Sequence, residues 1–188
     1  MHRFPFSSEQ KKYELNMGDK SYLCSVGKTG IRAEKNEGDG ATPAGEFFLR
    51  KMYYRPDKFN REEIKTELEV QALLKDDGWC DDANSPEYNT FIKLPFSGSH
   101  EELWRADDIY DLIIVVGYND DPVEKNKGSA IFIHIAREGY KPTAGCIALK
   151  KEDLLEILPS LTPDTSIKIA ESGKIEFENI KCLERLEL

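Results

Sequence analysis

The chain has 188 residues, with 26 basic and 35 acidic side chains and a formal net charge of −9. This length is enough for one domain with a sizeable core. Because no internal repeat or low-complexity linker divides the sequence, we expect a single domain over residues 1–188. The acidic balance argues against a nucleic-acid partner, which requires a basic face, and no apolar run is long enough to span a bilayer.

The predicted elements begin with a hairpin. Apolar and polar residues alternate over Tyr13–Met17 and Tyr22–Val26, on either side of the turn residues Gly18 and Asp19, which is a typical hairpin pattern. A Gly- and Pro-rich loop then leads to a predicted strand at Glu46–Tyr53, and a second short strand is expected within Thr66–Leu73.

The second half of the chain opens with a turn-rich segment at 76–91 and continues with apolar runs. Asp111–Asn119 and Ser129–Ala136 are rich in Ile and Val, which is typical of strands that are buried on both faces. Leucines at helical spacing after Lys151 predict a helix, and we expect closing strands at 165–170 and 174–180. The fold class predicted is therefore mainly β, a sandwich or barrel-like sheet with one or a few short α-helices.

Ile131–Leu158 contains a histidine and a cysteine that together suggest nucleophilic catalysis. Alternation places His134 on one strand face with Phe132 and Ala136, and Cys146 follows Gly145 at the start of another apolar segment. An imidazole within hydrogen-bond reach can take the proton of a thiol, so we expect a thiol of low pKa at Cys146. Backbone N–H groups of residues 144–146 are expected to hold an oxyanion, an effect worth about 3–4 kcal/mol. The alternative is a packed core histidine with an incidental thiol.

Neither a metal nor a cofactor is expected. The sequence has no C-x-x-C pair and no regular Cys/His cluster, and the glycines near Thr42 lack the spacing of a phosphate loop. The disulfide status of the other three cysteines stays open; they are Cys24, Cys80 and Cys182.

Two motifs resemble those of the YkuD-type L,D-transpeptidases over roughly Tyr13 to Ala170. The first is a histidine, a Gly/Pro-containing loop and then Thr-x-Gly-Cys before an aliphatic residue, which here comprises His134, Gly139, Thr143, Gly145, Cys146 and Ile147. The second is Thr-Pro-x-Gly-x-Phe, which here comprises Thr42, Pro43, Gly45 and Phe47. Two motifs in the same order as in the family are far more specific than either alone.

The resemblance implies a reaction and a substrate. Cys146 would attack meso-diaminopimelate of a peptidoglycan stem tetrapeptide and form a thioester, and His134 would act as general base and then acid, its ring oriented by a backbone carbonyl. An amine of a second stem would then complete a cross-link. Segments at 76–89 and 99–122 are similar to a proteobacterial branch, some members of which link the first and third stem residues. Gly145 is expected to belong to the catalytic machinery.

Substrate contacts are expected from five residues around the dyad. Arg137 can pair with a stem-peptide carboxylate, and Tyr118 and Asn119 end a strand whose loop can border the cleft. Thr143 and Ala144 immediately precede the Gly-Cys pair. For each of these the alternative is an ordinary surface or turn residue.

Two other functions remain open. Water as the acceptor would make the enzyme an L,D-carboxypeptidase. A non-catalytic cell-wall-binding module is suggested by Ala144 and Ala148, where many family members carry histidine or lysine and arginine or asparagine. The expected partners are peptidoglycan stem peptides, and the expected state is a monomer. The first 18 residues show no secretory signal, so a periplasmic or envelope location follows from the resemblance alone, with a cytoplasmic location as the alternative.

Overall fold

The computed structural model describes residues 12–179, most of which form a strand-rich barrel. The strands of the main sheet are β1 (Tyr13–Met17), β2 (Lys20–Ser25), β5 (Gly45–Tyr54), β6 (Glu69–Ala72), β10 (Leu112–Val116), β11 (Phe132–Ile135), β12 (Ile147–Leu149), β13 (Thr165–Ile169) and β14 (Lys174–Asn179). Smaller pieces are β3 (Ile31–Arg32), β4 (Thr42–Pro43), β7 (Asp77–Cys80), β8 (Phe91–Lys93), β9 (His100–Glu102) and the helix α1 (Lys151–Ile157).

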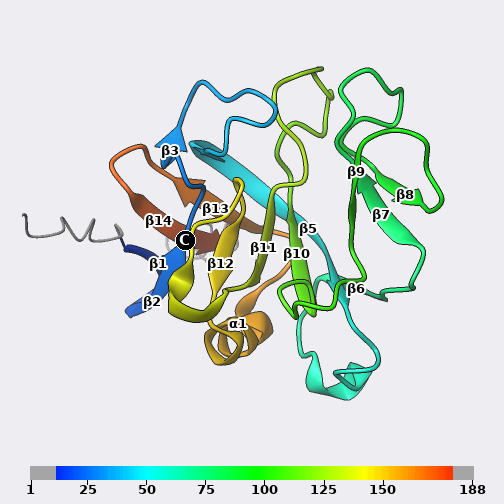
Figure 1. The fold of residues 1–188 in the computed structure, drawn as a ribbon. Coiled ribbons are helices and arrows are strands. Elements are labelled where there is room, and N and C mark those ends of the chain that lie inside the picture. Colours follow the sequence, from blue (N-terminus) through cyan, green and yellow to red (C-terminus); the bar gives the residue numbers. More distant parts are fainter. Residues whose placement is uncertain (1–11, 180–188) are drawn as a thin grey trace, which may run out of the picture.

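The main sheet closes on itself. Its nine strands follow the order β10-β11-β12-β2-β1-β14-β13-β5-β6, and β10 also pairs with β5. Leaving out β6, which extends the sheet beside β5, eight strands therefore form the closed ring in Figure 1. The prediction of a mainly β, barrel-like fold is confirmed.

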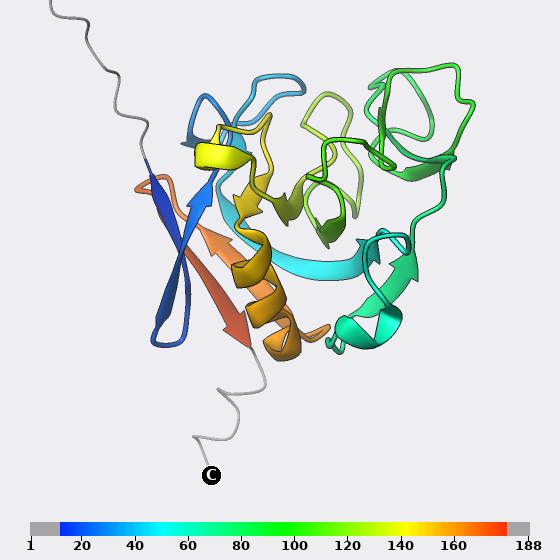
Figure 2. The same ribbon diagram turned by 60° about the horizontal axis from the view of Figure 1, so that its bottom comes forward.

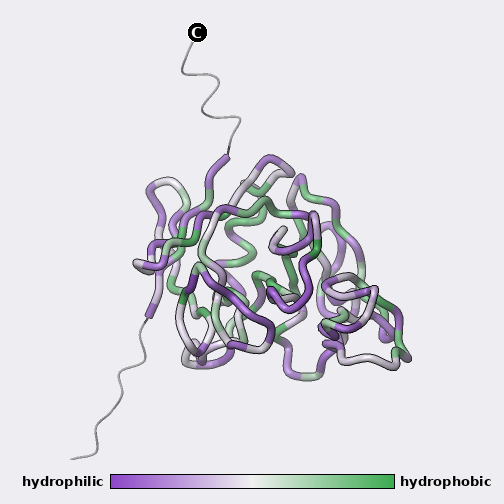
Figure 3. Tube along the Cα trace, turned by 90° about the horizontal axis from the view of Figure 1, so that it is seen from above, coloured by the Kyte–Doolittle hydropathy of each residue, from purple (hydrophilic) through white to green (hydrophobic). Residues whose placement is uncertain are grey.

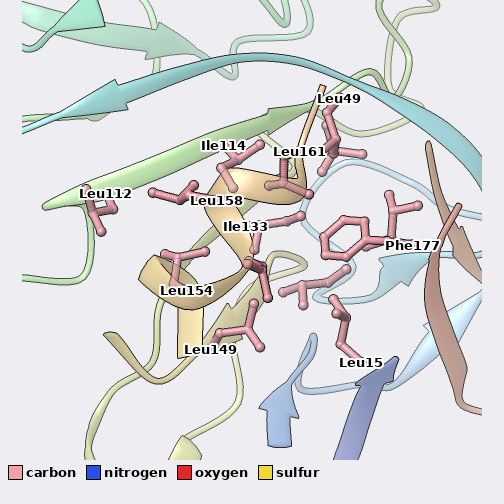
Figure 4. Close-up of a cluster of buried hydrophobic side chains, with 14 of the residues drawn as sticks. Leu15, Leu49, Leu112, Ile114, Ile133, Leu149, Leu154, Leu158, Leu161 and Phe177 are labelled. Atoms are coloured by element: carbon pink, nitrogen blue, oxygen red, sulfur yellow. The ribbon is translucent and has the colours of Figure 1, made fainter. Parts of the chain in front are cut away.

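Apolar side chains from alternate strand positions, most of them aliphatic, fill the interior of the barrel (Figure 4). They include Leu15, Leu49, Leu112, Ile114, Ile133, Leu149 and Phe177. Leu154 and Ile157 of α1 join the same core, and Figure 2 shows α1 running on directly from β12. The predicted helix is thus confirmed, and it turns its apolar side toward the barrel. Burial of each such aliphatic side chain stabilises the fold by about 1.5–3 kcal/mol.

A second apolar cluster lies on the outer face of β10 and β11. Ile113, Val115 and Phe132 pack there against Trp79, whose ring meets that of Phe132 edge-on at a centroid distance of 5.2 Å. Trp79 belongs to a small sheet of the order β8-β7-β9, which stands beside the barrel in Figure 1. Because both faces are covered, every residue of β10 is buried, as its continuous apolar run predicts.

Most predicted strands are confirmed, but the small sheet was not foreseen. The hairpin forms with β1 antiparallel to β2 around Gly18 and Asp19, and β13 and β14 pair as the closing strands, Ile180 lying outside the described residues. The prediction of a turn-rich segment at 76–91 was wrong for Asp77–Cys80, which forms β7 and pairs with both β8 and β9. Strands of three or four residues containing Gly78 and several charges have little strand propensity of their own.

Hydrophobic residues concentrate along the inner part of the chain trace, and hydrophilic residues lie mainly at its periphery (Figure 3). Within residues 12–179, no helix has the length and apolar character needed to cross a membrane.

Candidate active site

His134 and Cys146 lie on the same outer face of the barrel wall. Strands β11 and β12 pair in parallel, with Ile133 opposite Ile147 and His134 opposite Ala148. Since opposed residues share a face and neighbours along a strand alternate, the two isoleucines enter the barrel while Phe132 and Cys146 join the outer cluster. The two side chains of the expected dyad also line one cavity of about 400 Å³, which we call the His134 cavity.

Position 145 requires glycine. Gly145 has φ +155°, a conformation that L side chains rarely adopt, and a Cβ built there would lie 2.8 Å from the carbonyl oxygen of Ala41 and 3.3 Å from Cδ1 of Ile131. The close approach of the Ala41 backbone fixes the path of the chain just before the nucleophile.

The upstream Thr-Pro motif braces this loop. The buried hydroxyl of Thr42 donates to the carbonyl oxygen of Gly145 at 2.8 Å and accepts from the N–H of Gly27 at 2.9 Å. One side chain thus ties three segments together, which gives a physical reason for finding both motifs in one chain.

Thr143 shapes the loop from within. Its hydroxyl donates to the carbonyl oxygen of Cys146 at 2.6 Å and accepts from the N–H of Gly145 at 3.1 Å. Its own backbone bonds Val26 and Lys28. Since the N–H of Gly145 is engaged in this way, the N–H groups of Ala144 and Cys146 are the expected oxyanion donors. Thr143 and Ala144 both line the His134 cavity, so contact with substrate remains a prediction for each.

The thiol of Cys146 is neutral in this structure. It donates to the carbonyl oxygen of Ala130 at 3.2 Å, and the N–H of Phe132 lies 3.4 Å from the sulfur. Burial, followed by the negative charge of Glu101, raises the pKa of Cys146 to about 12, against the smaller lowering effect of the Phe132 N–H. The expectation of a low-pKa thiol is therefore wrong for this structure, because Cys146 is only 6% exposed and Glu101 adds a negative charge near it.

The N-terminus of helix α1 is too far from Cys146 to lower the pKa of its thiol. Helix α1 begins after β12, and at about 3.3 Å per strand residue its N-terminus lies on the order of 13 Å beyond Cys146. A helix terminus acts only over its first turn.

His134 is held as a neutral base. Its Nδ1 lies 2.9 Å from the carbonyl oxygen of Ile135. Because a carbonyl only accepts, Nδ1 carries the proton and Nε2 is left with a free lone pair. Burial lowers the pKa of His134 to about 4 despite this hydrogen bond. A backbone carbonyl thus orients the ring, as the resemblance implied.

A second cavity also borders Cys146. It has a volume of about 200 Å³ and is lined by Gly145 and Cys146 together with Lys35 and Glu37; we call it the Gly145 cavity. Ala144 and Glu101 border both cavities. The nucleophile therefore borders two cavities, each of which can take part of a substrate.

Arg137 lies in the His134 cavity with a second arginine that sequence reasoning missed. Both Arg105 and Arg137 line the cavity and bond Asp107, at 2.8 Å and 3.2 Å. These arginines hold the pKa of Asp107 at about 2. Within this cluster two guanidinium groups face one carboxylate, so an arginine can also pair with a substrate carboxylate, whereas Glu101 and Glu102 bring negative charge to the same cavity.

Tyr118 and Asn119 are not brought into either cavity of the thiol. The Tyr118 hydroxyl donates to the carbonyl oxygen of Lys127. The amide of Asn119 donates to the carbonyl oxygens of Glu124 and Gly128, at 2.9 Å and 2.8 Å. Both side chains close their own loop, so the geometry gives their predicted substrate contact no support.

Sequence reasoning also missed Tyr110 and Glu101. Tyr110 is 5% exposed, and its ring meets that of His134 edge-on with centroids 5.2 Å apart. Its hydroxyl donates to Glu101, which lies on β9. Tyr110 lies just before the apolar run of β10, whereas Glu101 lies on β9; this pairing of a tyrosine with a distant acid follows no spacing that could have indicated it.

Among the described residues, no group of three or more His, Cys, Asp or Glu side chains could hold a metal ion. The thiols of Cys24, Cys80 and Cys146 are free, whereas Cys182 lies outside the described range.

Comparison with known proteins gives one match. Residues 7–169 match the model of the YkuD family, described as the L,D-transpeptidase catalytic domain. No curated protein and no solved structure matches the chain. The matched range covers most of the chain and includes both motifs and the two cavities.

Proposed function

The chain belongs to the YkuD family of L,D-transpeptidase catalytic domains, and from this premise we propose that it forms peptidoglycan cross-links through a thioester on Cys146. The observation that carries the proposal is the parallel register of β11 and β12, which puts the imidazole and the thiol on one face and in one cavity. A packed histidine and an incidental thiol would not need to share an opening.

The first half-reaction forms the thioester. The thiol proton, which points to Ala130 at rest, passes to Nε2 of His134 as the sulfur attacks the carbonyl carbon of the L-centre of meso-diaminopimelate. The N–H groups of Ala144 and Cys146 hold the resulting oxyanion. The C–N bond to the terminal D-alanine then breaks, and His134 returns its proton to the leaving amine.

The second half-reaction transfers the acyl group. An amine of a second stem attacks the thioester carbonyl, His134 takes the proton of that amine, and the sulfur leaves and is protonated again. Because both groups of the dyad are neutral at rest, proton transfer accompanies attack and no thiolate accumulates. Arg137 pairs with a carboxylate of the stem peptide in the His134 cavity.

Incubation with disaccharide-tetrapeptide tests the reaction. We expect loss of D-alanine and a cross-linked dimer from the wild-type protein, and neither product from Cys146→Ala. Cys24→Ala is the matched control, because Cys24 is also a buried thiol, with a pKa that burial raises to about 12, but it lies in the barrel core. Tripeptide monomer without dimer would indicate the carboxypeptidase, and no product from a folded protein would contradict both enzymes.

Carbapenem labelling tests the identity of the nucleophile. A carbapenem, which acylates the nucleophile, is expected to add to Cys146 in intact-mass and peptide mapping; an adduct on another residue would contradict the assignment.

The linkage and the location of the enzyme need separate measurements. The structure of the dimer distinguishes a link between two third residues from a link between the first and third. We place the enzyme in the cell envelope because its family acts on peptidoglycan, and fractionation of the native protein tests that location.

A further inference from the structure

Half-buried Glu101 and buried Tyr110 form a hydrogen-bonded pair beside the dyad that the reaction above does not use. The pair joins two separate elements, because Glu101 lies on β9 of the small sheet and Tyr110 just before β10. The Tyr110 hydroxyl donates to the Glu101 carboxylate, and its ring packs edge-on against His134. A hydroxyl has one proton to donate, so the Tyr110 proton is committed to Glu101 in this structure.

Glu101 stands where the two cavities meet. Apart from Ala144 and Cys146, it is the residue that borders both the His134 cavity and the Gly145 cavity. Glu101 and Cys146 therefore both belong to the walls that a substrate group would meet in either cavity.

An ionised Glu101 opposes a negative charge on the sulfur. After burial, it is the largest influence that raises the pKa of Cys146, whereas hydrogen bonding from Tyr110 favours the thiolate. The two effects compete for one proton, because Tyr110 cannot donate fully to Glu101 and to the sulfur together. Neutralising Glu101 would remove the repulsion and free Tyr110 for the sulfur.

The charged surroundings of the pair favour a cation in the Gly145 cavity. The charged side chains that line the Gly145 cavity are Glu37, Asp81, Glu101, Lys28 and Lys35, so carboxylates outnumber ammonium groups. Arg105 and Tyr110 also act on Glu101, and His134 lies on the strand next to Cys146. Lys35 is already paired with Asp39 at 2.8 Å, and Glu37 accepts hydrogen bonds from Tyr88 and Ser129. Asp81, by contrast, lines the cavity with a buried Oδ1 that has no hydrogen-bond partner among the described residues.

We propose that Glu101 is a positioning residue that couples activation of Cys146 to an ammonium group of the substrate, an inference that rests on the proposed function. Without a cation in the Gly145 cavity, Glu101 holds the Tyr110 proton and repels charge on the sulfur. An ammonium group between Glu101 and Asp81 cancels that repulsion, and the thiol proton then passes more readily to Nε2 of His134. The ligand chemistry is a primary ammonium, such as that on the side chain of a diamino acid.

Alkylation kinetics test this coupling without requiring turnover. The rate of iodoacetamide addition to Cys146, followed by peptide mapping, is measured from pH 6 to pH 10 in the wild type, Glu101→Gln and Glu138→Gln. Glu138 is the matched control because it is an exposed carboxylate in the loop between His134 and Cys146. We expect Glu101→Gln to lower the apparent thiol pKa by about one unit, which is about a tenfold faster rate at pH 7.5, and Glu138→Gln to leave the profile unchanged. Tyr110→Phe, which removes the donor, should shift the profile in the opposite direction.

The ligand is tested on the wild type itself, so the result does not depend on whether a variant folds. Free meso-diaminopimelate is the probe, and pimelate, which lacks both amines, is its control. We expect several-fold faster alkylation with the diamino acid, no effect of pimelate, and no effect of either in Glu101→Gln. Equal rates with the two additives, or a Glu101→Gln profile identical to that of Glu138→Gln, would overturn the coupling. An unreactive Cys146 in every sample would instead count against the proposed function.

Discussion

Thr42→Val tests whether the upstream motif supports the nucleophile loop. Valine replaces the hydroxyl by a methyl group and keeps the shape of the side chain. In the folded protein it leaves two buried groups without their partner, the N–H of Gly27 and the carbonyl oxygen of Gly145, which now lie 2.9 Å and 2.8 Å from the hydroxyl.

The expected cost follows from those two contacts. A buried polar group that loses its hydrogen bond costs about 1–3 kcal/mol, and Thr42 is 0% exposed, so water cannot replace the hydroxyl. The free energy of unfolding should therefore fall by about 2–6 kcal/mol. Because Gly145 precedes the nucleophile, acylation of Cys146 by a carbapenem should slow as well.

Urea denaturation and stopped-flow acylation measure the two effects. The control is Thr29→Val, which removes a hydroxyl from the same part of the chain; that hydroxyl donates to the Asp39 carbonyl oxygen at 3.0 Å at an exposed position. Exposed substitutions of this kind change stability by about 0.5 kcal/mol or less. A loss below about 1 kcal/mol in Thr42→Val, or equal losses in the two variants, would refute the reasoning.

Three further outcomes are expected. Gly145→Ala should lower the free energy of unfolding by more than about 2 kcal/mol. Gly139 is also at positive φ but has open space around its Cβ position, so Gly139→Ala should lower it by only about 1–2 kcal/mol. Similar losses in the two variants would show that the contact with Ala41 does not matter. The pKa of His134 is about 4 in the folded protein and about 6.5 in the unfolded chain. Between these two pH values the unfolded chain binds more protons. The stability that neutral His134 contributes is therefore fully present above pH 6.5 and is lost as the pH falls toward 4. Between pH 7 and pH 5 the loss from this group is about 2 kcal/mol, and urea denaturation of His134→Gln should show a pH dependence smaller by that amount. Arg137→Gln should raise KM about fivefold with kcat little changed, the equivalent of about 1 kcal/mol for an exposed ion pair; an unchanged KM in steady-state assays would remove Arg137 from substrate binding.

Local patterns predicted the barrel well because its strands are long or strongly apolar. Alternation around Gly18 indicated the first hairpin, and the Ile- and Val-rich runs indicated β10 and β11, which are buried on both faces. The order of the strands was not predictable in this way. Pairing of β1 with β14, and of β10 with β5, joins segments far apart in the chain, and nothing in either segment specifies its partner.

The candidate site was predictable only where a motif carried it. His134, Gly145 and Cys146 follow one another within thirteen residues, and the structure brings them together. Glu101 reaches Tyr110 and the His134 cavity through the docking of a small sheet whose strands have weak propensity, so its role depends on tertiary packing. Burial also reversed the expected acidity of the thiol, since the solvation of a side chain cannot be read from its neighbours in sequence.

The short connection between β11 and β12 limits which insertions and deletions this part of the chain can accept. It runs from Ala136 to Cys146 without an α-helix, close to the shortest length, roughly a dozen residues, that lets a parallel strand return. A deletion would shorten the connection further and strain the register that keeps Cys146 on the outer face, and a slip by one residue would turn its side chain into the barrel. Homologues and engineered variants should therefore accept insertions around Gly139, where there is open space, and reject deletions.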